Sequence, residues 1–153
     1  MKKIVSILAV ALLALSMVAC GGKTETVTMR STQDQSGVTM EDTMTFEAKG
    51  DKITKITEVL KMDCSSFDDA TYELLKQSFD ELSSGYEGVA GVEFTPKEEG
   101  KVITWNIVID PKPETIEMLA KAGLLQTTGD ADKGLSLKVT KEGLSKNGYE
   151  EVK

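Results

Sequence analysis

The segment VTMEDTMTFEAKGDKITKITEVLKM, residues 38–62, decides the fold because it places one turn signal between two strand patterns. In its first half apolar and polar residues alternate, which predicts a half-buried strand. One face of that strand carries Val38, Met40, Met44, Phe46 and Ala48. Gly50-Asp51 is typical of a two-residue hairpin turn. The second half carries Ile53, Ile56, Leu60 and Met62, and the odd step from 53 to 56 predicts a bulge or a change of face.

Further elements follow on both sides of this hairpin. Val27 and Met29 open an earlier strand, and TQDQSG (32–37) predicts the turn after it. Residues 66–83 carry a broad apolar stripe at helical spacing, with Ser66 as the capping residue. The stripe contains Phe67, Ala70, Leu74, Leu75, Phe79 and Leu82. These signals predict a helix after three strands.

The second half of the chain adds two strands and two helices. After a strand that contains Phe94, PKEEG (96–100) predicts a turn. KVITWNIVID (101–110) is apolar on both faces, which predicts an interior strand of the sheet. Pro113 suits the first turn of a second helix, and Ser136 caps a third.

The element order is therefore βββ-α-ββ-α-α. Hairpin-length links predict an α+β fold, with an antiparallel sheet of about five strands and three helices on one face. The 153 residues suffice for one domain and are too few for two. We expect a leader over residues 1–19, a tether over 20–25 and a single domain over 26–153.

The N-terminus has the form of a secretory leader, with two lysines followed by an uncharged apolar run. Met17-Val18-Ala19-Cys20 matches the lipobox of bacterial lipoproteins, in which the cysteine receives a diacylglyceryl group and becomes the first mature residue. An ordinary signal peptide is the alternative. Two acyl chains of the palmitate kind anchor a protein stably. We therefore expect a lipid-anchored protein on the extracytoplasmic face of the cell membrane.

Three segments of the chain resemble the YehR-like family of bacterial lipoproteins. They are AKGDKITK (48–55), YEGVAGVEF (86–94) and DADKGLSLKVTKEGLSKNGYEEVK (130–153). The resemblance covers essentially the whole mature chain and implies a lipobox leader followed by a small α+β domain. Cys64 lies outside the shared pattern. The family has no established activity, so the resemblance implies no catalytic residue.

The composition excludes several classes of function. The chain has 18 Lys and Arg against 25 Asp and Glu, and cleavage before Cys20 would take its formal charge from −7 to −9 by removing two lysines. Nucleic-acid binding needs basic patches, so we expect no such partner. The chain has no histidine, which removes the commonest general base and the commonest metal ligand. We expect no cofactor and no metal.

Two residues are candidates for ligand binding, each with a structural alternative. Asp42 interrupts the apolar face of its strand, so it is either a buried acid with a raised pKa or an edge or bulge position that reaches water. Trp105 is either a core residue or a stacking platform for a sugar or peptidoglycan fragment. Four methionines form either core or an adaptable apolar pocket, namely Met29, Met40, Met44 and Met62.

Cys64 and the segment GDADKG (129–134) carry weaker signals. With Cys20 acylated, Cys64 is the remaining thiol, so no intramolecular disulfide can form. Neighbouring acids raise the pKa of a thiol and no histidine can activate it, which favours an inert side chain over a redox role. The spacing of Asp130 and Asp132 opens a calcium loop, but Gly134 and Lys141 stand at later ligand positions. A solvated turn fits this segment better.

These observations favour a non-catalytic binding or interaction module of the cell envelope. Its partner would be an envelope protein or a small apolar ligand. The alternative is a small envelope hydrolase or redox protein that uses Asp42 or Cys64.

Overall fold

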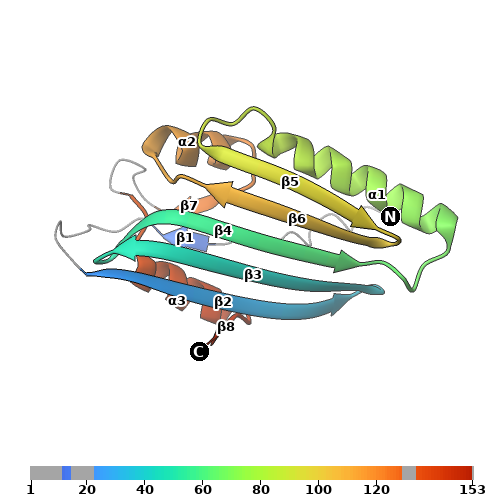
Figure 1. Cartoon of the computed structure of the whole chain (residues 1–153), viewed down its shortest axis with the longest axis horizontal. Coiled ribbons are helices and arrows are strands. Elements are labelled where there is room, and N and C mark those ends of the chain that lie inside the picture. Colours follow the sequence, from blue (N-terminus) through green and yellow to red (C-terminus); the bar gives the residue numbers. More distant parts are fainter. Residues whose placement is uncertain (1–11, 15–22, 129–133, 153) are drawn as a thin grey trace.

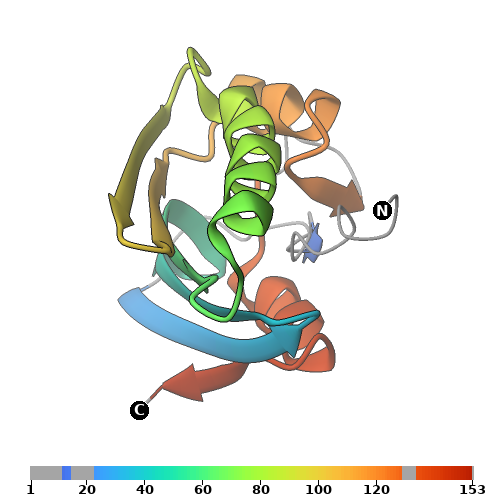
Figure 2. The same cartoon turned by 90° about the vertical axis from the view of Figure 1, so that its right-hand side faces the viewer.

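A computed structural model describes residues 12–14, 23–128 and 134–152. Six antiparallel strands form a curled sheet in the order β5-β6-β4-β3-β2-β8, and three helices lie on one of its faces (Figures 1 and 2). The strands are β1 Leu12–Ala14, β2 Thr24–Gln35, β3 Val38–Lys49, β4 Lys52–Asp63, β5 Val92–Glu99, β6 Val102–Ile109, β7 Gln126–Thr128 and β8 Glu150–Val152. The helices are α1 Asp69–Ser83, the 3-10 turn Ser84–Tyr86, α2 Pro113–Lys121 and α3 Leu137–Lys146. The predicted α+β class is confirmed.

The β2–β3–β4 meander forms the larger part of the sheet. Side chains alternate along β3, and every second residue from Asp42 to Ala48 is buried on the inner face, which the helices cover. The Gly50-Asp51 turn joins β3 to β4 as predicted, and a register shift between Glu47 and Ala48 is the expected bulge. The turn predicted over 32–37 is confined to Ser36 and Gly37, because β2 continues to Gln35 and pairs with Val38.

Helix α1 begins later than the sequence predicts. The side chain of Asp68 caps it by accepting a hydrogen bond from the Thr71 amide, whereas Ser66 donates to the Gly37 carbonyl. Tyr72 and Leu75 are buried, but Leu74 is 62% exposed, so the predicted apolar stripe is too wide.

Strands β5 and β6 form a hairpin at one side of the sheet. The turn predicted over 96–100 lies later than expected, at Gly100 and Lys101, because residues 96–99 continue β5. Pro96 is tolerated opposite Trp105 because β5 is an edge strand. Phe79 of α1 meets the Trp105 ring edge-on, with centroids 6.3 Å apart, so this helix covers β6 as expected.

The C-terminal third contains both confirmed and unpredicted elements. Pro113 begins α2, and the Ser136 side chain caps α3 by accepting from the Val139 amide, both as predicted. Strand β8 pairs with β2, and β7 pairs with β1 in a separate two-stranded sheet. Neither of these short strands was predicted.

Candidate functional site

Two carboxylic acids lie next to each other on the inner face of the sheet. Asp42 of β3 pairs with Leu60 of β4, and Met44 pairs with Glu58, so Asp42 and Glu58 are diagonal neighbours on adjacent strands. Side chains in this relation lie on one face, with backbones about 7–8 Å apart. Both strands are interior strands of the sheet. The fold therefore places two acids on the face where it buries its core.

Asp42 is buried, with 5% of its surface exposed. Its Oδ2 accepts a hydrogen bond of 2.5 Å from the Tyr149 hydroxyl, which reaches the sheet from the segment after α3. Its Oδ1 accepts no hydrogen bond from any described residue. The interpretation of Asp42 as an edge or bulge position is wrong, because the bulge lies at Glu47 and Ala48. A buried acceptor without a donor costs about 1–3 kcal/mol.

Burial raises the pKa of both acids, and repulsion from Asp42 adds to the shift of Glu58. Burial raises the pKa of Asp42 to about 6, although the Tyr149 hydroxyl opposes the shift. Burial, reinforced by the nearby Asp42 charge, raises the pKa of Glu58 to about 8. Burial and the same two acids also raise the pKa of Tyr149 and of Tyr86. The two acids therefore titrate as a coupled pair, and one of them holds a proton over a wide range around neutrality.

The surroundings of the pair are mainly apolar, although the buried Ser31 of β2 lies directly opposite Asp42. Met29 and Met44 pair across β2 and β3 beside the acids and are almost fully buried. Leu60 and Met62 continue the same face of β4, and both are buried. Of the four methionines, Met40 alone is only partly buried. A carboxylate here has few water molecules to solvate it, which is the cause of the raised pKa values.

Trp105 lies in the core. It is 2% exposed and contacts the rings of Phe79, Tyr86 and Phe94, with centroids 5.8 to 6.4 Å away. Its interpretation as a surface stacking platform is wrong, because these rings cover it.

Cys64 has the properties of an inert thiol. It is fully buried at the end of β4, and burial followed by the Asp63 charge raises the pKa of its thiol. A raised pKa keeps the sulfur protonated and weakly nucleophilic. Cys20 and most of the GDADKG segment lie outside the described residues.

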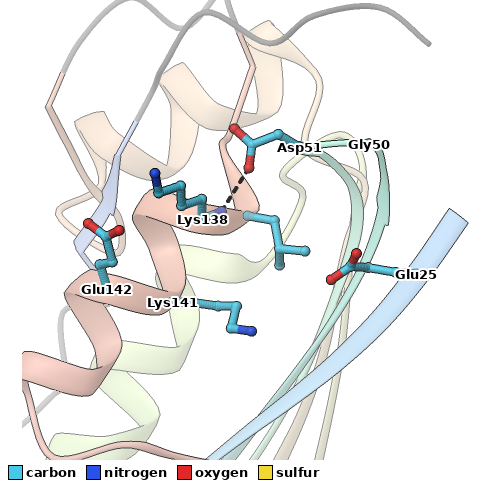
Figure 3. Close-up of a pocket in the computed structure, with 7 residues that line it drawn as sticks. Glu25, Gly50, Asp51, Lys138, Lys141 and Glu142 are labelled. Atoms are coloured by element: carbon cyan, nitrogen blue, oxygen red, sulfur yellow. Dashed lines mark hydrogen bonds between the residues drawn. The ribbon is translucent and has the colours of Figure 1, made fainter. Parts of the chain in front are cut away.

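A shallow cavity of about 410 Å³ lies at the start of α3 (Figure 3). Asp51 lies at the rim of this cavity. Its carboxylate accepts hydrogen bonds from the Lys138 amide and from the Ser136 hydroxyl, both at the start of α3. Lys141, on its wall, forms an ion pair of 2.8 Å with Glu151. Asp51 and Lys141 are engaged within the protein, so they offer less to a ligand than the unpaired Oδ1 of Asp42 does.

The described part of the chain shows neither a membrane-spanning helix nor a metal cluster. None of its helices is both long and apolar enough to cross a membrane. Within the same residues, no group of three or more Cys, Asp or Glu side chains is placed to hold a metal ion.

Glu58 is the site residue that the sequence interpretation misses. It stands in a run of inner-face residues at 56, 60 and 62, so the alternation within β4 could have revealed it. The bulge before residue 56 shifts the alternation by one residue, so the sequence before it does not show which residues of β4 face inward. Tyr149 follows α3, and nothing in the sequence joins it to Asp42.

Comparisons with known proteins connect the chain to a family of lipoproteins. Residues 25–150 match the family described as "Protein of unknown function (DUF1307)". An uncharacterized lipoprotein of Listeria innocua is 30% identical over 99% of this chain and 97% of its own length. The uncharacterized lipoprotein YehR of Escherichia coli is 26% identical over 99% of this chain and 97% of its own. The solution NMR structure of E. coli YehR superposes with a TM-score of 0.65 and 25% identity, covering 87% of this chain and 94% of that one.

Proposed function

Because the chain belongs to the DUF1307 family, whose matched relatives are named lipoproteins, we propose that it is a lipid-anchored binding protein of the cell envelope. In this proposal Cys20 carries the diacylglyceryl anchor, residues 20–25 are the tether, and the domain lies on the extracytoplasmic face of the membrane. The lipobox pattern before Cys20 and the names of the relatives support the anchor. The role of the domain is to bind and not to catalyse.

One observation carries the binding role, namely that Asp42 Oδ1 has no donor among the described residues although Asp42 is 95% buried. Proteins rarely leave such a group without a partner, and each exception calls for an explanation. A ligand with a hydrogen-bond donor supplies the missing partner. Glu58, on the neighbouring strand, adds a second acid to the same place.

The chemistry of the pair defines the ligand class. Apart from Ser31 opposite Asp42, the neighbouring side chains of the sheet are apolar, so the body of the ligand is apolar and small. Burial and, after it, repulsion from Asp42 raise the pKa of Glu58, and a positive charge beside the two acids offsets that repulsion. A primary ammonium group has three donors and one positive charge. The best complement is therefore an ammonium group on a short apolar chain.

Three probes of equal chain length test this ligand class. Hexylammonium, hexanol and hexanoate are titrated by calorimetry into the mature protein at neutral pH. We expect hexylammonium to bind about tenfold or more tightly than the other two, because a hydrogen bond to a charged group contributes about 1.5–3 kcal/mol. Asp42→Asn removes the charge with little change of shape and should weaken hexylammonium binding to the level of hexanol.

The matched control is Glu41→Gln, which removes one negative charge from the neighbouring, exposed position of β3. It should leave hexylammonium binding unchanged. Equal loss in both variants would mean that net charge alone attracts the amine, and the absence of hexylammonium binding to the wild type would refute the Asp42 site.

The hydrolase alternative makes a different prediction for the same variants. Two acids with unequal pKa values can act as general acid and general base. Glycosides or peptides that are turned over by the wild type and not by Asp42→Asn would replace the binding role with a catalytic one. The raised pKa of the buried Cys64 thiol argues against the redox alternative.

A further inference from the structure

Four exposed lysines lie at the end of the β2–β3–β4 meander where the chain enters the domain. Lys23 precedes β2, Lys49 ends β3 and Lys52 begins β4, and the register of the strands places all three at one end (Figure 1). Lys138 lies at the same end, because its amide donates to the carboxylate of Asp51 in the turn between β3 and β4 (Figure 3). We call these four residues the lysine end.

The placement of these lysines is unfavourable for the domain alone. Lys49 and Lys52 lie directly opposite each other across β3 and β4. Like charges in that relation are destabilising. None of the four lysines forms an ion pair with a described residue. Their charges are therefore available to a partner outside the domain.

Acids near the lysine end compensate its charge only in part. The exposed Glu25 lies there, and so does Asp51, whose carboxylate accepts hydrogen bonds at the start of α3. Glu142 lies one turn further along α3. Two ion pairs are neutral as units, namely Glu47 with Lys55 at 3.4 Å and Asp110 with Lys112 at 2.8 Å. The lysine end is therefore basic, although the chain as a whole has 25 acids against 18 Lys and Arg.

The lysine end is also the part of the domain nearest to the proposed lipid anchor. Lys23 is three residues after Cys20, and its carbonyl accepts a hydrogen bond of 3.0 Å from the Gly50 amide. Three residues span at most about 11 Å, and the Debye length at physiological ionic strength is about 8 Å. Lys61, nine residues beyond Lys52 on β4, lies about 30 Å further along the strand. The lysine end is thus within electrostatic reach of the membrane, and the opposite end of the meander is not.

We propose that the lysine end binds the anionic headgroups of phospholipids in the membrane that holds the anchor, and thereby fixes the orientation of the domain. A lysine beside an anionic surface strengthens binding about fivefold. Repulsion between that surface and the remaining, acidic part of the chain favours the same orientation, with the β3–β4 turn toward the membrane. This inference rests on the lipid anchor proposed above and uses no part of the Asp42 site.

The test uses the leader-free chain, residues 20–153. The described core lies entirely between Val27 and Tyr149, so removal of the leader leaves that core complete. The Cys20 thiol is coupled to a maleimide-bearing lipid, which replaces the natural anchor, and the buried Cys64 is protected from the reagent. The lipid is inserted into nanodiscs of phosphatidylcholine, or of equal parts phosphatidylcholine and phosphatidylglycerol. NMR then measures how strongly a paramagnetic lipid broadens each backbone amide.

Two double variants of equal charge separate a local effect from an effect of net charge. One carries Lys49→Glu and Lys52→Glu. The control carries Lys61→Glu and Lys97→Glu, two exposed positions at the opposite end of the sheet. Lys49→Gln with Lys52→Gln repeats the test without adding acids, so a loss of stability in the Glu variant does not decide the result.

The readout is the broadening of the Gly50 amide relative to that of Gly37, at the opposite end of β3. This ratio should be about fivefold or more greater on anionic than on neutral nanodiscs. The variants of the lysine end should lower it to the neutral value, whereas the control should keep it. Equal ratios on the two nanodiscs, or equal losses in the variants of both ends, would overturn the proposal. Absence of acylation at Cys20 in cells would refute the natural anchor and leave this measurement unchanged, so the two proposals fail separately.

Discussion

Replacement of Trp105 by alanine tests the packing on which the fold depends. The ring is 2% exposed and is surrounded by Phe79 of α1, Tyr86 of the following turn and Phe94 of β5. Truncating such a side chain removes its buried surface and leaves a cavity that three rigid rings cannot fill. Deletions of this kind cost about 3–5 kcal/mol. For a domain of this size that loss lowers the Tm by about 10–20 °C.

Differential scanning calorimetry of the leader-free chain measures the effect, with Leu74→Ala as the control. Leu74 lies on the same helix as Phe79 but is 62% exposed, so its truncation should change the free energy of unfolding by less than about 0.5 kcal/mol. A Tm of Trp105→Ala within a degree or two of wild type would refute the packing between α1 and β6. It would also indicate that Trp105 is exposed and could serve as a binding platform.

Three further predictions concern the anchor, the thiol and the acid pair. Cys20→Ser should move the protein from the membrane fraction to the soluble fraction, and persistence in the membrane would show that the leader itself anchors the chain. Cys64 should react slowly with a thiol reagent at neutral pH because burial raises its pKa, and a measured thiol pKa below about 7 would contradict this. Glu58 has a raised pKa in the folded state, so its contribution to stability is full below about pH 4.5 and is lost as the pH rises through about 8. Glu58→Gln should therefore flatten the profile of unfolding free energy against pH and be more stable than wild type at pH 8, whereas parallel profiles would show that Glu58 is solvated.

The sheet could be predicted from the sequence where the signal is local. The β3–β4 hairpin is predicted by the alternation on both sides of Gly50-Asp51, and the structure confirms the two strands and the turn between them. Strands β7 and β8 have three residues each, too few for any periodicity, and they exist because β1 and β2 offer them an edge. The start of α1 was misplaced because Ser66 and Asp68 can both cap a helix. A bond from Ser66 to the Gly37 carbonyl, distant in sequence, decides between them.

The candidate site, too, could be predicted only where the signal is local in the sequence. Asp42 is visible as an acid on an apolar face, because that observation needs only the pattern of one strand. Its partners need the register between strands and the path of the C-terminus. Glu58 is brought beside it by the pairing of β3 with β4, and Tyr149 reaches it from a position 107 residues away. No spacing in the sequence contains this information.

The central claim is that the buried Asp42 and the partly buried Glu58 form an acid pair that receives an ammonium group. A carbon-13 NMR titration of the two side-chain carboxyls, with and without saturating hexylammonium, measures this directly. Without the amine, both carboxyls should titrate above their ordinary range, near 6 for Asp42 and near 8 for Glu58. With the amine bound, the pKa of each should fall, because the positive charge favours the ionised acids. Carboxyls that titrate in the ordinary range, or that do not respond to hexylammonium, would contradict the claim.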